Sequence, residues 1–413
     1  MSQLQKKVKA VMENNRRTKD KHQFTIPSPE LYPFQWLWDS CFHAIILSHF
    51  DIEAAKAELR SVVSAPLPSG MLPHIIYHTR PEDVEKPWGR EERGDIITAA
   101  WGVVGTSSIT QPPLLALAAR RLYELEKDTS LITEIYPALK DHFTYLDRER
   151  TVEGFGPLVA IINPDESGED NSPRFDEALD LAPMHVPDVH LDARLDLIKH
   201  FADCKFQTAA CMYKHFSVID VPFNILYAED LEHLASLAQL LNKPKDTALF
   251  RIRSVAVRKA IAEHLYQDNE FQSYDVTNQK HIKVNTWAKF MPLYGGLLSK
   301  KEARELIFTE LLNPESFGTK FPIPTTASNE PSFDAENGFW RGPTWMAPNW
   351  FIYHGLIRYG FTSHAENIKA KSLELLEKSG FREQYNPITG EGLGGQNFTW
   401  GGLVLDMQEN SQY

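Results

Sequence analysis

Cysteine is scarce in this sequence, with only Cys41, Cys204 and Cys211 among 413 residues. A sparse and odd set excludes the disulfide framework that holds many small secreted domains together. No CxxC pair is present, and no cysteine–histidine pair has the usual spacing of a zinc site. We therefore expect three free thiols in apolar surroundings, and neither a metal nor any other cofactor.

Long hydrophobic runs are absent as well. The longest apolar segments, such as FHAIIL at 42–47, are much shorter than the ~20 residues that cross a bilayer. The charged N-terminal stretch lacks the apolar run of a secretory signal. These absences favour a cytoplasmic protein without a membrane partner.

Basic residues are outnumbered, since 43 Lys and Arg against 55 Asp and Glu give a net charge of −12. An acidic chain is a poor partner for nucleic acids, which bind basic surfaces. The remaining class of partner is a small molecule, and a homo-oligomer is possible. With 42% hydrophobic and 24% charged residues, the composition is that of a folded globular chain.

Helical periodicity dominates what is present. Apolar residues in 51–64 recur about every 3.6 positions, and about a dozen segments behave in this way. The segments 36–50 and 344–360 are apolar on most sides, which is typical of buried helices, whereas 246–265 and 361–378 carry charged faces. Alternating buried and half-exposed helices predict an all-α fold in two concentric layers, an α/α barrel.

Two other features complete the predicted organisation. A helix is expected at 95–104, and 272–286 is expected to be a short hairpin or a loop. Because no linker interrupts the chain, we predict a single domain, 1–413, with its long loops over one mouth of the barrel. These loops, rich in aromatic residues, are 23–37, 65–94, 153–190, 313–343 and 380–400.

The loops repeat one mixture of residues: aromatics, amides, glycine and an acid. It recurs in LYPFQWLWDS at 31–40 and FWRGPTW at 339–345, while 163–180 contains seven carboxylates. Hydrolysis of a glycosidic bond needs two carboxyl groups. Taken singly, Trp345 can pack the core and Asp39 can cap a helix. The recurrence favours a sugar site.

Six segments carry a resemblance to a known family. In sequence and order they resemble glycoside hydrolase family 63, and within it the compact branch that hydrolyses mannosylglycerate and glucosylglycerate. The most specific part is DNSPRFD together with the later E-x-YNP-x-TG, because trehalases share the other pieces. The resemblance implies an (α/α)6 barrel and an inverting α-glycosidase for a small α-glucoside or α-mannoside. The segments are YPFQWLWDS (32–40), GMLPHIIYH (70–78), TQPP (110–113), SGEDNSPRFD (167–176), FWRGPTW (339–345) and EQYNPITGEGLGGQNFTWGG (383–402).

The resemblance also implies roles for individual residues. Asp170 matches the general acid, Glu383 the general base and Asp39 a carboxylate that binds sugar hydroxyls. We expect Asp170 to be buried so that it holds its proton, and the two catalytic carboxyls to lie ~6.5–9.5 Å apart. Glu391 is an alternative base. The other candidate substrate-binding residues are Tyr32, Trp36, Trp38, Tyr77, Gln111, Arg194, Trp340, Arg341, Trp345 and Gln396.

The segment after the DNSP motif departs from the pattern of the family branch. A glycerate aglycone carries a carboxylate and needs a cation. His185 and Leu191 stand where an arginine and a tyrosine are expected, and Arg194 or Arg174 can substitute. The sugar end of the site is therefore better defined than the aglycone end.

Other functions remain compatible with the residues. One is a trehalase- or kojibiose-type disaccharidase, and another is a sugar 2-epimerase-like barrel that uses some of the 15 histidines. Arg341 can also be a structural partner of a buried acid. A non-catalytic sugar-binding barrel is a third class, although both expected carboxylates are present.

Overall fold

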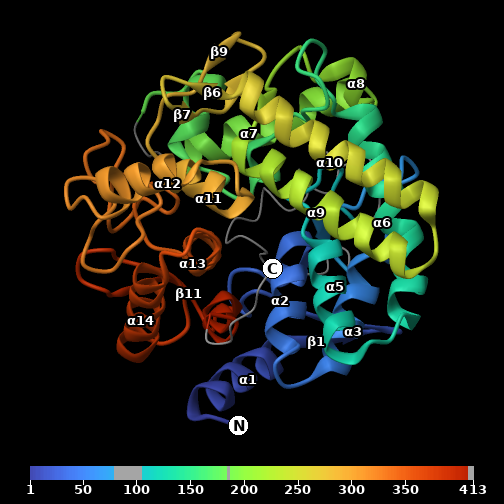
Figure 1. Cartoon of the computed structure of the whole chain (residues 1–413), viewed down its shortest axis with the longest axis horizontal. Coiled ribbons are helices and arrows are strands. Elements are labelled where there is room, and N and C mark those ends of the chain that lie inside the picture. The colour runs from blue at the N-terminus through green and yellow to red at the C-terminus, as the bar shows by residue number, and fades with distance from the viewer. Residues whose placement is uncertain (79–104, 184–186, 408–413) are drawn as a thin grey trace.

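The computed structural model describes residues 1–78, 105–183 and 187–407 (Figure 1). The predicted helix at 95–104 lies outside these residues. In the described chain, an inner ring closes on itself because each element contacts the next and the last contacts the first. The ring consists of α2 (Leu37–Leu47), α5 (Leu115–Glu126), α9 (Val221–Leu240), α11 (Met291–Gly295), α13 (Met346–Arg358) and the 3₁₀ helix η7 (Thr399–Leu405).

A second layer of helices surrounds this ring in Figure 1. Most outer helices follow an inner helix directly in the sequence; for example, α3 follows α2 and α14 follows α13. The exception is the first helix, α1, which packs on the last element, η7. The two concentric layers confirm the helical prediction. The outer helices are α1 (Gln3–Asn15), α3 (Ile52–Val62), α6 (Ser130–Glu149), α10 (Pro244–His264), α12 (Lys300–Leu306, continued by the π turn η6, Ile307–Leu311) and α14 (Thr362–Ser379).

The two layers follow from the side chains. Every residue of α2 is buried, as a sequence that is apolar on most sides predicts. The outer helix α3 buries one face only, and the Asp51 side chain caps it by accepting a hydrogen bond from the Ala54 N–H. The helix α1 begins with a capping box of Ser2 and Gln5, a signal that the sequence interpretation passed over.

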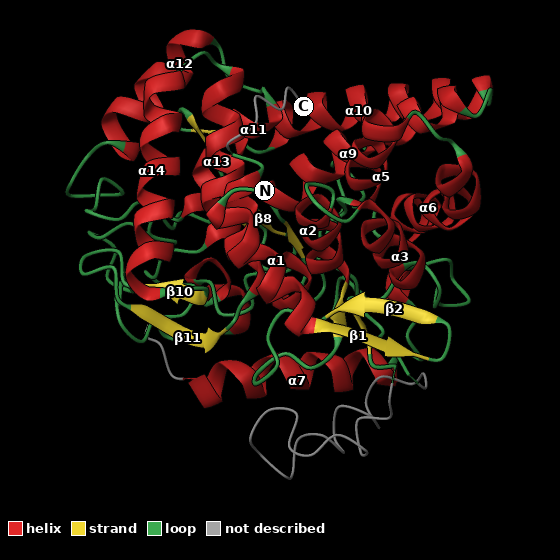
Figure 2. Cartoon of the chain, turned by 90° about the horizontal axis from the view of Figure 1, so that it is seen from below, coloured by secondary structure: helices red, strands yellow, loops and turns green. Residues whose placement is uncertain are grey.

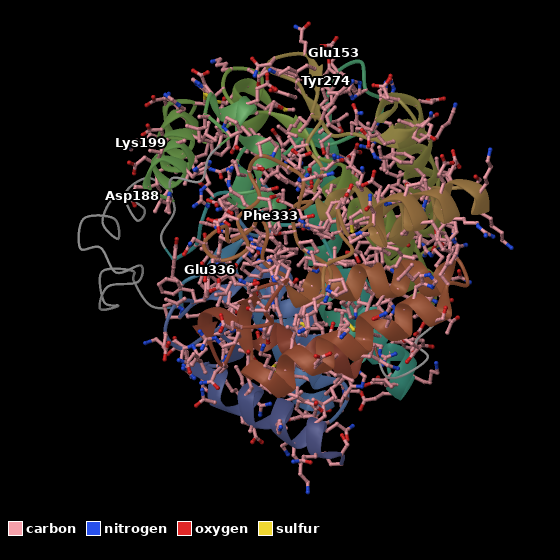
Figure 3. The ribbon with its side chains drawn as sticks, turned by 90° about the vertical axis from the view of Figure 1, so that its left-hand side faces the viewer. Glu153, Asp188, Lys199, Tyr274, Phe333 and Glu336 are labelled. Carbon is pink, nitrogen blue, oxygen red and sulfur yellow. A yellow bond between two sulfur atoms is a disulfide. The ribbon has the colours of Figure 1, made fainter. Side chains whose placement is uncertain are left out.

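Short strands and one further helix lie at a mouth of the ring. Figure 2 shows α7 (Pro187–Asp203) running below the hairpins β1–β2 and β10–β11, and Figure 3 shows Asp188 and Lys199 of α7 at the surface. The expected hairpin within 272–286 is formed by β8 and β9. The strands are β1 (Arg16–Lys19), β2 (His22–Thr25), β3 (Gln35–Trp36), β4 (Ile75–Ile76), β5 (Val218–Ile219), β6 (Tyr266–Gln267), β7 (Glu270–Phe271), β8 (Tyr274–Asp275), β9 (Lys280–His281), β10 (Arg382–Tyr385) and β11 (Gly392–Gln396).

One prediction about the cysteines is wrong. Cys204 and Cys211 form a disulfide, and only Cys41 is a free, buried thiol. After α7 ends at Asp203, the chain turns back into the short helix α8 (Thr208–Cys211), which brings the Cα atoms of the two cysteines to 5.9 Å from each other.

No helix of the described chain is long and apolar enough to cross a membrane.

Candidate active site

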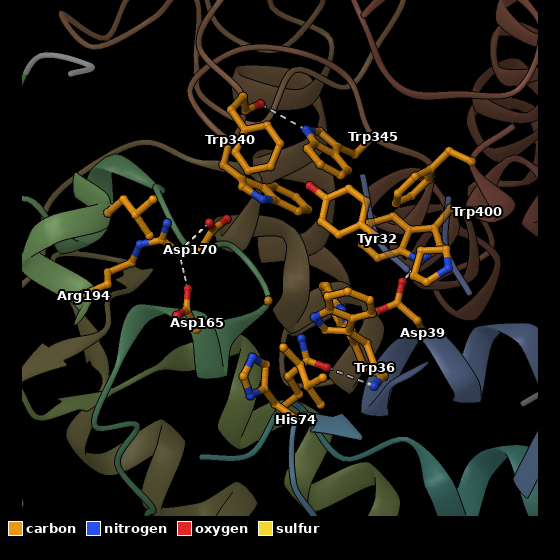
Figure 4. A pocket seen from close by; sticks show the side chains of 18 of the residues that line it. Tyr32, Trp36, Asp39, His74, Asp165, Asp170, Arg194, Trp340, Trp345 and Trp400 are labelled. Carbon is orange, nitrogen blue, oxygen red and sulfur yellow. Dashed lines mark hydrogen bonds and ion pairs between the residues drawn. The ribbon is translucent and has the colours of Figure 1, made fainter. Parts of the chain in front are cut away.

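A cavity of about 240 Å³ opens where the long loops meet the inner ring (Figure 4). Its lining is mostly aromatic and apolar, with a few carboxylates and one arginine, as is typical of a small-molecule site. The lining residues are Pro27, Tyr32, Trp36, Trp38, Asp39, His74, Ile75, Tyr77, Gln111, Asp165, Gly168, Asp170, Leu191, Arg194, Leu195, Ile198, Phe339, Trp340, Trp345, Phe398 and Trp400.

Tryptophans from distant segments form one wall. The rings of Trp340 and Trp345 stack in parallel with centroids 4.0 Å apart, and Trp38 meets Trp400 edge to face at 5.1 Å. Gly168 lies so close to Trp38 that a Cβ atom at this position would be 2.3 Å from the indole. The wall is therefore rigid and offers flat apolar faces against which a sugar ring can stack.

Asp39 lies in the first turn of α2 and points into the cavity. Its carboxylate accepts a hydrogen bond of 2.7 Å from the indole N–H of Trp400, which follows it by 361 residues. Burial raises the pKa of Asp39 to about 6, although His43 and the Trp400 hydrogen bond act in the opposite direction. Asp39 is therefore held in one orientation, with its second oxygen available to a ligand hydroxyl.

Glu383 lies on β10 and is almost completely buried. Its carboxylate accepts hydrogen bonds from the Tyr32 hydroxyl at 2.5 Å and from the Gly395 N–H at 2.8 Å. Burial raises the pKa of Glu383 to about 7, while these two hydrogen bonds lower it. The glycine at position 394 leaves room for this carboxylate, because a Cβ atom added there would lie 2.2 Å from Glu383 Oε2. Such a carboxyl can exchange a proton near neutral pH.

Asp170 lines the cavity and lies in the loop that follows the 3₁₀ helix η2 (Pro164–Ser167). Its carboxylate accepts a hydrogen bond of 2.5 Å from Nη1 of Arg194, and the same nitrogen also donates to Asp165. The Asp170 side chain is 28% exposed. We expected deeper burial; Asp170 instead has a cationic partner.

The other acids of the 163–180 segment fix the loop. Glu166 pairs with Arg150 through two hydrogen bonds of 2.6 Å, and both side chains are buried. Glu169 binds Arg174 and the indole N–H of Trp287, again within the core. Glu166 and Glu169 are therefore structural, whereas Asp165 and Asp170 face the cavity.

Most predicted substrate-binding residues come together in this cavity. They include residues from four separate loops, and the Gln111 side-chain oxygen accepts a hydrogen bond of 3.2 Å from the N–H of Trp38. Those that line the cavity are Tyr32, Trp36, Trp38, Asp39, Tyr77, Gln111, Arg194, Trp340 and Trp345.

Other predicted residues lie elsewhere. Arg341 is fully buried and paired with Asp176, and Gln396 is exposed on β11. The alternative base, Glu391, is also exposed. Arg174 belongs to the ion-pair network beside the loop.

Two polar cavity residues, Asp165 and His74, were not among the predicted glycosidase site residues, and His74 was named only for the epimerase-like alternative. His74 is buried, its Nδ1 lies 2.6 Å from the Ser107 hydroxyl, and burial lowers its pKa to about 3. His74 is neutral at physiological pH as a result. His185, which was considered for the aglycone, is outside the described residues. Among those described, no group of three or more His, Cys, Asp or Glu side chains is arranged to hold a metal ion.

Comparison with known proteins identifies the family. Residues 32–401 match the family model described as the mannosylglycerate hydrolase MGH1-like glycoside hydrolase domain. The chain belongs to this family of glycoside hydrolases. The mannosylglycerate hydrolase of Thermus thermophilus is 33% identical over 410 residues, which cover 91% of this chain and 94% of that protein. The glucosylglycerate hydrolase of Mycolicibacterium hassiacum is 27% identical, with coverage of 94% and 95%.

Solved structures of this family have the same fold. The crystal structure of the GH63 mannosylglycerate hydrolase from Thermus thermophilus in complex with Tris superposes with a TM-score of 0.86 at 30% identity, covering 98% of this chain and 99% of that one. The neutral trehalase of Saccharomyces cerevisiae, at 14% identity and a TM-score of 0.62, shares the fold alone. The chain is therefore a family 63 glycosidase with the fold of these barrels.

Proposed function

We propose that this family 63 enzyme is an inverting α-glycosidase in which Asp170 is the general acid and Glu383 the general base. The observation that supports the proposal is that Asp170 lines the tryptophan-lined cavity and that Tyr32, another lining residue, donates a hydrogen bond to Glu383. They are close enough that the charge of Asp170 contributes to raising the pKa of Glu383. Two carboxyls in unlike surroundings are what acid–base cleavage of a glycoside requires.

The reaction follows from these positions. Asp170 gives its proton to the glycosidic oxygen as the bond between this oxygen and the anomeric carbon breaks. Glu383, oriented by Tyr32 and Gly395, accepts a proton from the water that attacks the anomeric carbon from the other side. The proton then leaves Glu383 for solvent, and Asp170 takes up another. The hydroxyl of the free sugar has the opposite anomeric configuration to the bond that was cleaved.

For the substrate we propose an α-mannoside or α-glucoside of glycerate. The relatives in the comparison are mannosylglycerate and glucosylglycerate hydrolases. Asp39 and the tryptophan wall offer a carboxylate and aromatic faces to the sugar ring. On the side of the proton donor, Arg194 is a cation on the cavity wall, where a glycerate carboxylate would lie.

The test combines variants and products. Asp170→Asn and Glu383→Gln preserve shape, and each should lower kcat by roughly 10²–10⁴-fold, the usual contribution of an acid or base. The matched control is Glu391→Gln, which should retain the wild-type rate because Glu391 is exposed. A large loss in Glu391→Gln and none in Glu383→Gln would reverse the assignment of the base.

A panel of substrates completes the test. Proton NMR of the first-formed sugar from mannosylglycerate, glucosylglycerate, trehalose and kojibiose gives specificity and stereochemistry together. We expect the β-anomer from a glycerate α-glycoside. Formation of the α-anomer contradicts inversion, and faster cleavage of trehalose or kojibiose contradicts the glycerate assignment.

A further inference from the structure

Arg194 is shared between two carboxylates on the cavity wall, as the dashed lines in Figure 4 show. One nitrogen, Nη1, donates to both Asp165 and Asp170. The backbone position of Arg194 is fixed within α7, where its carbonyl oxygen accepts a hydrogen bond of 3.1 Å from the Asn163 side chain. Within the described residues, Nη2 of Arg194 has no hydrogen-bond partner. The guanidinium can therefore change partners without moving its helix.

This arrangement is at odds with the task of Asp170. A general acid must carry a proton before the bond breaks. A guanidinium bonded to a carboxylate stabilises the ionised form, and the oxygen that accepts from Arg194 is then not available to a proton. As long as Arg194 binds Asp170, it therefore opposes the form of Asp170 that the proposed catalysis requires.

We propose that the aglycone carboxylate takes the hydrogen bond of Arg194 from Asp170, so that Asp170 becomes the proton donor only when an anionic aglycone is bound. This inference rests on the proposed function. In the exchange, Asp170 takes one proton from solvent, and its contact with Arg194 is replaced by a contact between Arg194 and the substrate. Asp165 is a positioning residue, because its own bond to Nη1 keeps Arg194 at the wall while the other partner changes.

The surrounding groups are consistent with this exchange. Asp170 is faced by Asp165 from η2, Arg194 from α7, Tyr32 from the loop before β3 and Glu383 from β10. Burial raises the pKa of Tyr32 well above its usual value, so its hydroxyl stays neutral. Of these groups, Asp165 and Asp170 bind the cation Arg194.

The decisive experiment uses two substrates that differ only in charge, the α-mannosides of glycerate and of glycerol. For the wild-type enzyme, we expect kcat to be at least ~10-fold higher for the glycerate compound, and its activity to persist to higher pH, because a general acid commonly contributes more than this factor. A cation that only binds the aglycone would change KM and leave kcat and the pH profile alike for the two substrates. That result would overturn the proposal. Failure to hydrolyse either substrate would instead contradict the proposed function.

Variants separate the roles of the two partners. Arg194→Gln should abolish the kcat difference between the substrates, because Asp170 then has no Arg194 contact for either aglycone to displace. Asp165→Asn should lower kcat for the glycerate substrate with little change in KM. In this variant Asp170 is the only one of the two carboxylate partners that Arg194 retains, so Arg194 should leave Asp170 less readily. The matched control is Asp196→Asn, an exposed carboxylate on the same helix. Equal losses of kcat on both substrates, together with a lower melting temperature, would show a merely structural role.

Proton uptake gives a readout that does not depend on turnover. Calorimetric titration of the wild-type enzyme with D-glycerate, in two buffers of different ionisation enthalpy, should show uptake of about one proton per glycerate bound. Glycerol should show none, and Asp170→Asn should bind D-glycerate without proton uptake. Binding of D-glycerate to the wild-type enzyme without proton uptake would overturn the exchange.

Discussion

At the scale of single residues, the side chains that surround Glu383 and Asp170 distinguish these two carboxylates, whose functional group is the same. Glu383 is buried and accepts a hydrogen bond from Tyr32, whereas Asp170 is partly exposed and paired with Arg194. The sequence motifs predicted both as site residues: Asp170 lines the cavity, and Glu383 is linked to it through the hydrogen bond from Tyr32. They did not predict the partners, because Arg194 and Tyr32 reach them only through the fold. Arg341 was predicted to bind substrate, but its guanidinium is buried and binds Asp176, which is the structural alternative that the sequence also left open.

The pH dependence of Glu383 can be tested through Tyr32. The hydrogen bond from Tyr32 lowers the pKa of Glu383, which burial raises to about 7. A general base must be ionised, so kcat/KM should fall as the pH drops through this value. In Tyr32→Phe the pKa should rise, and the acid limb should move to higher pH by about one unit, the size of one charge-assisted hydrogen bond.

The measurement is a pH–rate profile of kcat/KM from pH 5 to 9. Tyr213→Phe removes a hydroxyl from a surface tyrosine and serves as the control, with an unchanged acid limb expected. A shift of the limb to lower pH in Tyr32→Phe would mean that Glu383 is not the group that titrates there.

At the scale of elements, most helices could be predicted because their periodicity is local. The predicted ranges 51–64 and 246–265 correspond to α3 and α10. The helix α1 was missed because its buried face is narrow, with only Val8, Val11, Met12 and Asn15 inside. The Cys204–Cys211 disulfide could not be predicted from composition, because it depends on a reversal of the chain between α7 and α8.

Reduction of this disulfide should loosen the end of α7. A bridge across seven positions contributes about 2–3 kcal/mol to the free energy of unfolding by restricting the unfolded chain. The paired variant Cys204→Ser with Cys211→Ser should therefore unfold at lower urea concentration, and dithiothreitol should have the same effect on the wild type. Cys41→Ala is the control: dithiothreitol should lower its free energy of unfolding by as much as that of the wild type, because Cys41 is not part of the bridge. If dithiothreitol destabilises the double variant as much as the wild type, the bridge is not the cause.

At the scale of the whole molecule, the ring is closed by segments from opposite ends of the chain. The helix α1 packs on η7, and the buried side-chain amide of Asn15 donates to the carbonyl oxygens of Pro27 and Asn397. The two ends of the chain also meet in the proposed site, since Tyr32 binds Glu383 and Asp39 binds Trp400. Pairings across more than 350 positions cannot be read from local periodicity.

Asn15 tests the strength of this closure. Asn15→Ala removes both hydrogen bonds; the Pro27 carbonyl oxygen keeps its bond from the Thr399 N–H, but the Asn397 carbonyl oxygen loses the Asn15 donor. The free energy of unfolding should fall by about 1–3 kcal/mol. The measurement is equilibrium unfolding in urea, monitored by tryptophan fluorescence. Asn367→Ala, at an exposed position of α14, should change the stability by less than about 0.5 kcal/mol. Equal stability of the two variants would show that this bridge does not hold the ends together.

The closure between the two ends also sets when the enzyme can first work during its synthesis. A ribosome makes Tyr32 and Asp39 more than 340 residues before Glu383 and Trp400. Until then the nascent protein has the proposed proton donor but not the proposed base, and the carboxylate of Asp39 lacks its indole partner. On this assignment, catalysis cannot begin before residue 383 has been made, and a transcript that is cut short before codon 383 yields a chain without the proposed base.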